Sequence, residues 1–437
     1  MRIHRLTAFQ IPIALRKPVR HASHERRANE TLILRCVMDD GSCGWGEGLP
    51  RPYVTGESMD SVWRHLEQTD FTPLRDATFS CASDASLAID DFRFADVAAD
   101  EGIDVRESFG NSVRCALELA ILDAACRADQ ISLGDFILQH PALRQATVEN
   151  RSIHQPPGAS PRSPERPDEP NASAFRQVQG RPVNEVFYSG AITSMTPRGQ
   201  WISALKMKLF AFRQVKVKVG ADGISDVDLL RRVRRIVGRK VNLRLDANEA
   251  WYCDEVASKI APLMPFLPTS LEQPVPHREV AGLRQVRSEI HVPIMLDESL
   301  CCREDAERAL VGQGCDLFNI RLSKCGGISR SLELVALARQ HGIGYQLGCQ
   351  VGETGILSAA GRHFACNVPD IRYLEGSFDR FLVRESLTEQ DLTFHYGGKG
   401  PRLHGSGLSS DVKECRVREL AVRTLDIIVP SNDPATS

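Results

Sequence analysis

The sequence lacks several features that mark specialised classes of protein. No stretch reaches the roughly 18 consecutive uncharged apolar residues that span a bilayer, and the first residues read as strand in place of a signal-peptide core. The 13 cysteines are scattered and none stands in a Cys-x-x-Cys pair, which disfavours the common zinc and redox motifs. We therefore expect reduced thiols and a cytoplasmic protein that does not enter the membrane.

An excess of charge of one sign is also missing. Lys and Arg number 54 against 56 for Asp and Glu, and the formal net charge is -2. Such a chain has no overall positive field to attract nucleic acid or an anionic membrane surface, so we predict a small-molecule ligand. With 437 residues, of which 42% are hydrophobic and 25% charged, the sequence suits one large domain or two ordinary ones.

Residues 1–140 predict an N-terminal α+β domain. Residues 31–38 are β-rich, residues 39–42 read as a turn, and a return strand begins at Cys43, which together predict a meander. In residues 113–128 apolar side chains recur at spacings of three and four, which predicts an amphipathic helix. Residues 75–107 are acidic with little periodicity, and we expect an irregular surface segment there.

Two further segments predict little regular structure. Residues 141–182 read as a Pro-rich disordered insertion, because residues 156–170 alternate proline with polar and charged residues and offer no apolar face to bury. Residues 386–437 predict a C-terminal segment that returns to the N-terminal domain and ends in a disordered tail.

Between residues 183 and 385, short β-branched runs alternate with helical stretches. Eight such units in about 200 residues predict a (β/α)8 barrel of the TIM type, in which the C-terminal strand ends carry the chemistry. An open doubly wound sheet is the alternative, but the nearest match to its glycine-rich turn, at residues 312–314, precedes a strand. The candidate strands are residues 183–189, 214–219, 242–245, 270–272, 294–296, 317–320, 343–347 and 372–374.

Charged residues stand where these predicted strands end. A single charge at a strand end is usually structural, but six in register indicate a site at one rim, because two share one strand and the other four follow at intervals of one strand and helix. Three carboxylates converging in a dry cavity would raise one another's pKa unless a cation lay among them, and an all-oxygen set suits a hard metal such as Mg2+. A lysine beside that metal could then transfer a proton. The six residues are Lys216, Lys218, Asp246, Glu272, Asp297 and Lys324.

Five motifs follow one another along the predicted barrel: Val215-Lys216-Val217-Lys218-Val219-Gly220, Leu245-Asp246-Ala247-Asn248, Leu271-Glu272-Gln273-Pro274, Leu296-Asp297-Glu298-Ser299 and Asn319-Ile320-Arg321-Leu322-Ser323-Lys324-Cys325-Gly326-Gly327. In this order they resemble the enolase superfamily, specifically its muconate-lactonising subgroup of cycloisomerases, o-succinylbenzoate synthases and dipeptide epimerases, and residues 44–47 and 53–57 are similar to the capping domain of that family. The resemblance implies an enolase-like fold, in which an α+β capping domain precedes the barrel.

The resemblance also implies roles for the site residues. Asp246, Glu272 and Asp297 would bind Mg2+, with Mn2+ as a substitute. Lys218 and Lys324 would be acid/base lysines on opposite faces of the substrate, and Lys216 an electrostatic helper. Asn248 and Glu298 stand close to the metal carboxylates in sequence, and we expect them to orient these ligands. Glu353 resembles the family's acidic residue after the seventh strand, for which a substrate contact and a structural role are both open. Glu375 is a second candidate substrate contact, or it reflects the Glu-containing eighth strand of cycloisomerases.

Such an enzyme abstracts the α-proton of a carboxylate substrate and forms an enediolate. The resemblance favours a racemase or epimerase of an amino-acid derivative or dipeptide, with a muconate-type cycloisomerase or an o-succinylbenzoate synthase-like dehydratase as the alternative. Epimerases that bind a dipeptide ammonium show Asp-x-Asp near the eighth strand, whereas this chain has Glu375-Gly376-Ser377. We also expect a homo-oligomer, and a basic loop at residues 20–27 that favours an anionic distal group on the substrate.

Overall fold

The computed structural model describes residues 1–20, 25–103, 105–144 and 182–430. The segment 156–170, the end of the C-terminal tail and the centre of the basic loop lie outside these residues. Within them, none of the helices combines the length and the apolar character that crossing a membrane requires. The predicted domain boundaries at residues 140, 182 and 385 stay predictions.

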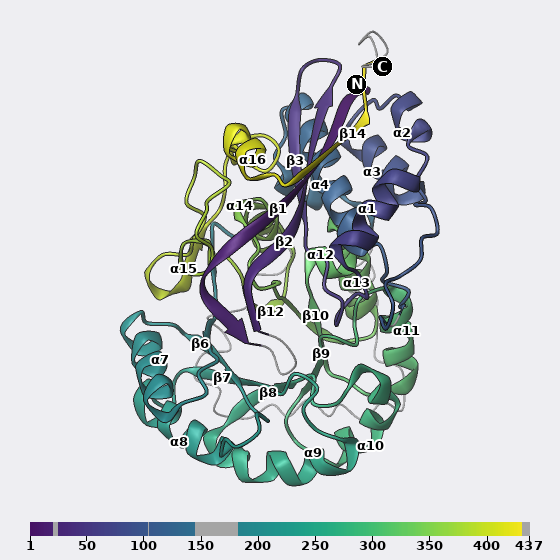
Figure 1. Ribbon diagram of the computed structural model, residues 1–437. Helices are drawn as coiled ribbons and strands as arrows, with labels where there is room; N and C mark the ends of the chain where they lie inside the picture. The colour runs from purple at the N-terminus through teal and green to yellow at the C-terminus, as the bar shows by residue number, and fades with distance from the viewer. Residues whose placement is uncertain (21–24, 104, 145–181, 431–437) are drawn as a thin grey trace.

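A four-stranded antiparallel sheet forms the centre of the N-terminal part. It contains β1 (Ile3–Arg20), β2 (Glu25–Met38) and β3 (Cys43–Gly48), in the order β14-β1-β2-β3. The predicted meander is thus confirmed as β2, a turn and β3. Strand β14 (Arg423–Ile428) comes from the end of the chain and pairs antiparallel with β1, and Figure 1 shows it in yellow beside the purple first strand.

The sheet is covered by helices that precede the barrel in sequence. The central one, α4, confirms the predicted helix and is buried along almost its whole length. Helix α3 lies in the segment predicted to be irregular, so that prediction was wrong for residues 82–91, whereas residues 92–103 and 105–107 contain neither helix nor strand. Its buried face consists of small and apolar residues, Ala82, Ala85, Ser86 and Ile89, which are spaced for a helix but give a weak hydrophobic signal. The helices are α1 (Met59–Gln68), α2 (Thr72–Asp76), α3 (Ala82–Asp91), α4 (Asn111–Ala128) and α5 (Leu133–Gln139).

Alternate glycines in β3 explain how closely α4 approaches the sheet. A Cβ atom added at Gly44 would lie 2.1 Å from the backbone nitrogen of Ala124, and one at Gly46 would lie 1.9 Å from the carbonyl oxygen of Ala116. Only a residue without a side chain allows this contact, so these two glycines position α4 against the sheet.

The second part is an eight-stranded parallel sheet in sequential order from β5 to β12. The backbone N–H of Ser189, just before β5, donates to the carbonyl of Leu374 in β12 at 2.8 Å, which joins the two ends of the sheet into a barrel. The predicted barrel and its capping domain are therefore confirmed. The strands are β5 (Gly190–Ile192), β6 (Gln214–Lys218), β7 (Asn242–Asp246), β8 (Pro268–Glu272), β9 (Ile294–Leu296), β10 (Leu317–Ile320), β11 (Gly344–Leu347) and β12 (Ile371–Leu374).

Seven of these strands agree with prediction, and the first does not. The segment predicted as the first barrel strand, residues 183–189, contains β4 (Glu185–Phe187), which pairs antiparallel with β13 (Lys399–Pro401). The first barrel strand follows at β5 and consists of Gly190, Ala191 and Ile192, and a Cβ at Gly190 would lie 2.2 Å from the sulfur of Met207. Three residues with one β-branched side chain give a weaker signal than the apolar run before them.

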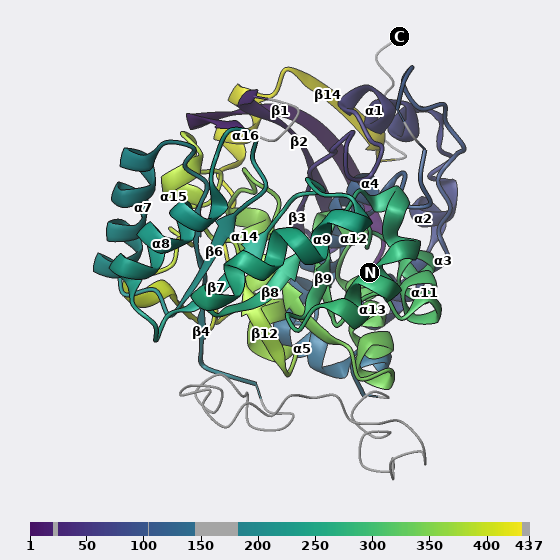
Figure 2. The same cartoon turned by 90° about the horizontal axis from the view of Figure 1, so that it is seen from below.

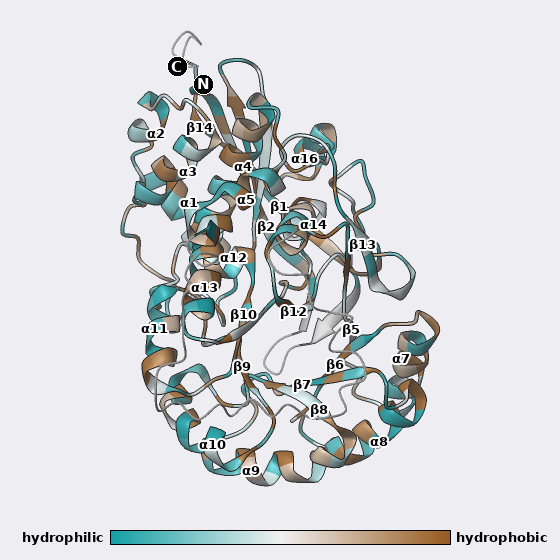
Figure 3. Cartoon of the chain, turned by 180° about the vertical axis from the view of Figure 1, so that it is seen from behind, coloured by the Kyte–Doolittle hydropathy of each residue, from teal (hydrophilic) through white to brown (hydrophobic). Residues whose placement is uncertain are grey.

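Helices surround the barrel and connect its strands, as Figure 2 shows from below. Helix α8 buries Leu229, Leu230 and Val233 on its inner face, and Figure 3 shows the teal hydrophilic residues of the outer helices alternating with brown hydrophobic ones. The helices are α7 (Pro197–Leu209), α8 (Asp226–Val237), α9 (Cys253–Ile260), α10 (Leu283–Glu289), α11 (Arg303–Gly312), α12 (Leu322–Cys325), α13 (Ile328–Gln340) and α14 (Gly355–Asn367), with 3-10 turns at Ala261–Phe266, His277–Gly282 and Tyr396–Gly398. After the last barrel strand, α15 (Asp379–Leu382) and α16 (Glu414–Leu420) contact β1 of the N-terminal sheet.

Candidate active site

The C-terminal ends of the barrel strands bring the predicted acidic residues to one rim. Lys218, Asp246 and Glu272 are the last residues of β6, β7 and β8, and the strand register pairs Lys218 with Asp246 and Asp246 with Glu272. Asp297 follows β9 directly. Because parallel strands end at the same edge of a barrel, these side chains meet where TIM-type barrels carry their chemistry.

Lys216 lies at the centre of the charged cluster. Its Nζ is 2.9 Å from Glu375 Oε2 and 3.3 Å from both Asp246 Oδ2 and Glu272 Oε1. Burial alone lowers the pKa of Lys216, but Glu272, Glu375 and Asp246 together hold that pKa well above its ordinary value. Lys216 therefore stays a cation, in agreement with the electrostatic role that the sequence predicts.

The three predicted metal carboxylates are buried at the rim. Asp246, Glu272 and Asp297 are at most 1% exposed. Burial raises the pKa of Glu272 to about 8 in spite of Lys216, and the nearby Asp246 and Asp297 contribute to the rise. Such mutual repulsion in an all-oxygen set is what a hard divalent cation relieves, so the donor chemistry of these residues fits Mg2+.

Two cations lie between these carboxylates in the structure. Lys216 contacts both Asp246 and Glu272, and Arg321 contacts Asp297 and lies 3.8 Å from Glu272.

Among the described residues, three acidic or thiol groups converge within 4.8 Å at a different place, formed by Glu107, Cys302 and Asp305. Arg308 pairs with both carboxylates of that group, which leaves it little net negative charge.

Lys324 is not placed where the resemblance predicts. It lies on α12, beyond the end of β10, and is 0% exposed. Its Nζ is 2.7 Å from the carbonyl oxygen of Asp297, 2.8 Å from that of Asn319 and 3.0 Å from Asp297 Oδ1. All three ammonium hydrogens thus have protein acceptors. The placement gives Lys324 a role in holding Asp297 and does not support the predicted acid/base role.

Arg321 takes the rim position of β10, which the sequence interpretation missed. It follows Ile320, the last residue of the strand, and its Nη2 contacts Asp297 Oδ2. Burial raises the pKa of Asp297, yet Arg321 and Lys324 together hold that pKa at about 2. The signal was present in the sequence, because Arg321 stands immediately after its strand as Asp297 does, whereas Lys324 stands three residues further on.

Arg244 is a second residue that the sequence interpretation missed. It precedes Asp246 by two positions on β7, is 0% exposed, and its Nη2 lies 2.9 Å from Glu375 Oε1. Its guanidinium also stacks over the ring of Tyr373 at 4.6 Å. Lys216 and Arg244 lower the pKa of Glu375 to about 2 although burial raises it. The predicted substrate residue Glu375 therefore has both oxygens next to protein cations.

The two residues predicted to orient the metal carboxylates lie beside them. The backbone N–H of Asn248 donates to Asp246 Oδ1 at 3.1 Å, and its side-chain amide donates to Glu298 Oε1 at 3.4 Å. Burial, followed by the charge of Asp297, raises the pKa of Glu298 well above its ordinary value. Both residues thus occupy positions from which they can orient ligands, and the role itself stays a prediction.

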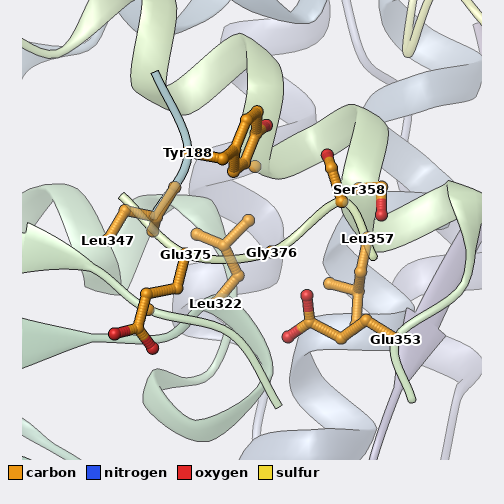
Figure 4. Close-up of a pocket in the computed structure, with 11 residues that line it drawn as sticks. Tyr188, Leu322, Leu347, Glu353, Leu357, Ser358, Glu375 and Gly376 are labelled. Atoms are coloured by element: carbon orange, nitrogen blue, oxygen red, sulfur yellow. The ribbon is translucent and has the colours of Figure 1, made fainter. Parts of the chain in front are cut away.

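A small cavity of about 10 Å³, the space of about one water molecule, lies beside the charged cluster (Figure 4). In Figure 4 the predicted substrate residues Glu353 and Glu375 lie at opposite sides of it, with Leu322 between them. Glu353 accepts a hydrogen bond from the backbone N–H of Gln350 at 2.6 Å, and burial raises its pKa to about 8. The remaining lining is mostly apolar or uncharged: Tyr188, Leu347, Gly348, Leu357, Ser358, Gly361, Gly376 and Ser377.

Lys218 completes the rim from β6. It is half-buried, and it makes no hydrogen bond or ion pair with the rest of the chain as far as the structure describes it. An ammonium without an acceptor at the end of a barrel strand is available to a ligand. Of the three predicted lysines, Lys218 is therefore the one whose nitrogen is free.

Known proteins share both the sequence pattern and this architecture. The family model described as enolase C-terminal domain-like matches residues 202–414. The chain is 28% identical over 429 residues to the L-Ala-D/L-Glu epimerase of Bacillus subtilis, with 95% of this chain and all of that protein covered. It is 24% identical to the N-succinyl-L-Arg/Lys racemase of Bacillus cereus, with 97% and 98% covered.

Solved structures confirm the fold. The N-succinyl Arg/Lys racemase from Bacillus cereus and the dipeptide epimerase from Cytophaga hutchinsonii, the latter complexed with Mg and D-Ala-L-Val, each give a TM-score of 0.77 at 21% identity and cover 98% of this chain and 100% of theirs. The chain is thus similar to members of the enolase superfamily in its barrel sequence and shares their fold, as its motifs predicted.

Proposed function

We propose that this protein is a Mg2+-dependent isomerase that removes the α-proton of a carboxylate substrate and racemises or epimerises an amino-acid derivative. The observation that carries the proposal is the rim itself, where three buried carboxylates stand at the ends of adjacent strands beside one lysine whose nitrogen has no acceptor among the described residues. The full-length similarity to an epimerase and a racemase supports it.

The residues of the rim divide the work. Asp246, Glu272 and Asp297 would hold Mg2+, which supplies Lewis-acid stabilisation of the substrate carboxylate when bound. The Mg complex of the Cytophaga hutchinsonii epimerase supports this metal. Lys218 takes the α-proton as an amine, and Lys216 keeps a positive charge beside the carboxylate as negative charge develops on it.

The surroundings of the cavity favour a substrate whose amino group is acylated. Glu375 is already paired with Lys216 and Arg244, and burial raises the pKa of Glu353 to about 8, so that it is largely protonated at pH 7. Neither offers the free negative charge that a ligand ammonium requires. An N-acylamino acid, which carries no such charge, fits this environment better than a dipeptide with a free amino terminus.

A muconate-type cycloisomerase is the second candidate. Lys324 is buried with three acceptors, so one free lysine remains at the rim, and cycloisomerisation needs a single proton transfer. A racemase, in contrast, must deliver a proton to either face of the α-carbon.

Incubation with a panel of N-acylamino acids, dipeptides and muconates in D2O with Mg2+, read by NMR and mass spectrometry, tests the proposal. We expect solvent deuterium at the α-carbon and loss of optical purity for at least one N-acylamino acid. Deuterium exchange into none of the compounds would refute the proposal, and lactone formation from a muconate alone would establish the second candidate. The proposal also includes Mn2+ as a substitute for Mg2+, self-association and a cytoplasmic location. The purified protein tests the first two, by the same assay with Mn2+ in place of Mg2+ and by its mass in solution.

A further inference from the structure

We propose that strand β10 contributes an electrostatic cation, Arg321, and no acid/base group, so that Lys218 is the only lysine of this site that moves a proton. The inference rests on the proposed α-proton transfer and assigns the residues that carry it out. It follows from the positions of two side chains, Lys324 and Arg321, which are three residues apart and face different surroundings.

Lys324 has no hydrogen left to transfer or to offer to a ligand. An ammonium has three hydrogens to donate. The Nζ of Lys324 lies 2.7 Å from the carbonyl oxygen of Asp297, 2.8 Å from that of Asn319 and 3.0 Å from Asp297 Oδ1. If it left this position, the carbonyl of Asn319 would lose this donor in a fully buried environment, and the carbonyl of Asp297 would keep only the backbone N–H of Leu300 at 3.0 Å. Lys324 is a positioning residue that fixes both the backbone and the carboxylate of Asp297.

Arg321 faces the rim from the side opposite Lys218. The barrel order places β6 second and β10 sixth of eight strands, so their ends lie across the barrel from one another. The side chain of Arg321 is 13% exposed, and its Nη2 reaches Asp297 and approaches Glu272. Its buried Nε has no hydrogen-bond partner in the described part of the chain, which leaves a donor for a ligand oxygen.

The chemistry of a guanidinium decides what Arg321 can do there. It stays protonated in proteins and donates through a planar fork that matches a carboxylate, so it binds negative charge but does not serve as a base. We therefore assign to Arg321 a contact with the carboxylate of the substrate, where it stabilises the negative charge of the enediolate.

The proton balance then involves one lysine and one water molecule. The Lys218 amine removes the α-proton and becomes an ammonium, leaving the C–H electron pair in the enediolate. A water molecule on the β10 side donates a proton to the opposite face of the α-carbon. The hydroxide that remains takes the proton from the Lys218 ammonium, which restores both water and amine.

The test measures α-proton exchange in D2O with Mg2+, separately for each enantiomer of the N-acylamino acid that the wild type exchanges fastest. Lys218→Ala, and Lys218→Arg as a charge-preserving control, should reduce exchange of both enantiomers at least 100-fold. Continued exchange of one enantiomer by both variants would overturn the inference, because another side chain would then act as a base. Absence of exchange by the wild type across the panel would refute the proposed function instead.

Arg321→Lys provides a second, independent result. It places a titratable ammonium at the β10 rim and should raise exchange of the enantiomer whose α-proton faces β10 severalfold over the wild type. No increase would overturn the placement of Arg321 at the substrate. Lys324→Met should weaken Mg2+ binding about tenfold in calorimetry, because Asp297 loses its support. Unchanged Mg2+ affinity together with exchange of one enantiomer only would restore the acid/base role of Lys324.

Discussion

Two groups of carboxylates are buried in this protein but have different partners. At the rim, Asp297 and Glu375 are each met by two side-chain cations. Between the two parts of the chain, Glu47 on β3 and Glu118 on α4 are met by backbone N–H groups at the starts of α14 and α13. We call Glu47 and Glu118 the interface glutamates.

The difference lies in what each environment leaves unsatisfied. Glu47 accepts from Thr354 and Leu357, and Glu118 from Ile328 and Ser329, at 2.5 to 3.0 Å, so that each carboxylate completes a helix N-terminus. At the rim, burial raises the pKa of Glu272 to about 8, and repulsion from Asp246, Glu375 and Asp297 adds to the rise. Burial also raises the pKa of Glu47 and Glu118, so a buried carboxylate with a raised pKa does not by itself identify a functional site, whereas several carboxylates and cations that meet at one place do.

The largest expected effect separates the two groups by activity. Asp246→Asn, Glu272→Gln and Asp297→Asn should each lower turnover on the order of 10³-fold or more, because each removes a predicted Mg2+ ligand. The melting temperature of Asp246→Asn and Glu272→Gln should stay within a few degrees of the wild type, since fewer like charges then share the rim, whereas Asp297→Asn should also lower stability because Arg321 and Lys324 lose their buried anion. Full activity of all three variants in chelator-treated buffer would rule out the metal assignment.

The interface glutamates should show the reverse pattern. Glu118→Ala removes the acceptor of two buried backbone N–H groups and should lower the free energy of unfolding by about 2–3 kcal/mol, while Glu118→Gln should cost less because it keeps one acceptor oxygen. Urea unfolding measures the loss, and turnover per folded molecule should remain within about twofold of the wild type. A stable but inactive Glu118→Gln variant would show that the interface controls the rim directly.

The sequence was sufficient for the fold and for much of the site. Seven strands, the meander and the α4 helix followed from periodicity, and Asp246, Glu272 and Asp297 were found because each ends a strand or follows it directly. The first barrel strand and α3 were missed because small residues carry little hydrophobic signal. Lys324 was misplaced for another reason, since a motif shows which residues are near one another in sequence but not which one the chain turns toward the cavity.

Arg244 shows the same limit of sequence interpretation, in a residue that was missed. Its position two residues before Asp246 places it on the same face of β7, and that much could be read from the sequence. That it lies fully buried against Glu375 depends on β12, which is more than 120 residues away along the chain. Long-range pairing of charges is not visible in local patterns.

A smaller effect, on the pH dependence of the free energy of unfolding, distinguishes the interface glutamates from the rim carboxylates. Burial raises the pKa of Glu47 to about 7, whereas an unfolded glutamate titrates near 4.3. The folded state then binds more protons between these values, so stability falls as the pH rises through this window. Glu47→Gln should remove roughly 2–3 kcal/mol of that fall between pH 5 and pH 8.

Unfolding free energies at several pH values measure this slope. Glu67→Gln is a suitable control, because the Glu67 side chain is 45% exposed and pairs with Arg423 at the surface. We expect the control to retain the wild-type slope. The same slope in the Glu47 variant would mean that this carboxyl keeps an ordinary pKa when buried, and the contrast with the rim would lose its electrostatic basis.

The smallest expected effect concerns the Pro-rich segment at residues 156–170, whose charges belong neither to the rim nor to the interface glutamates. Residues 156–170 include Glu165, Asp168 and Glu169 among prolines, with no apolar face that could bury them, and the sequence predicts that they pair neither with a helix terminus nor with the rim. Shortening a long insertion changes loop-closure free energy by only about 0.6 kcal/mol per factor of two in length. Deletion of these residues should therefore leave turnover and melting temperature nearly unchanged in side-by-side assays with the full chain. A substantial loss of stability would mean that this segment contributes buried contacts, and a loss of turnover alone would connect it to the rim, so either result would add a third environment to the two compared above.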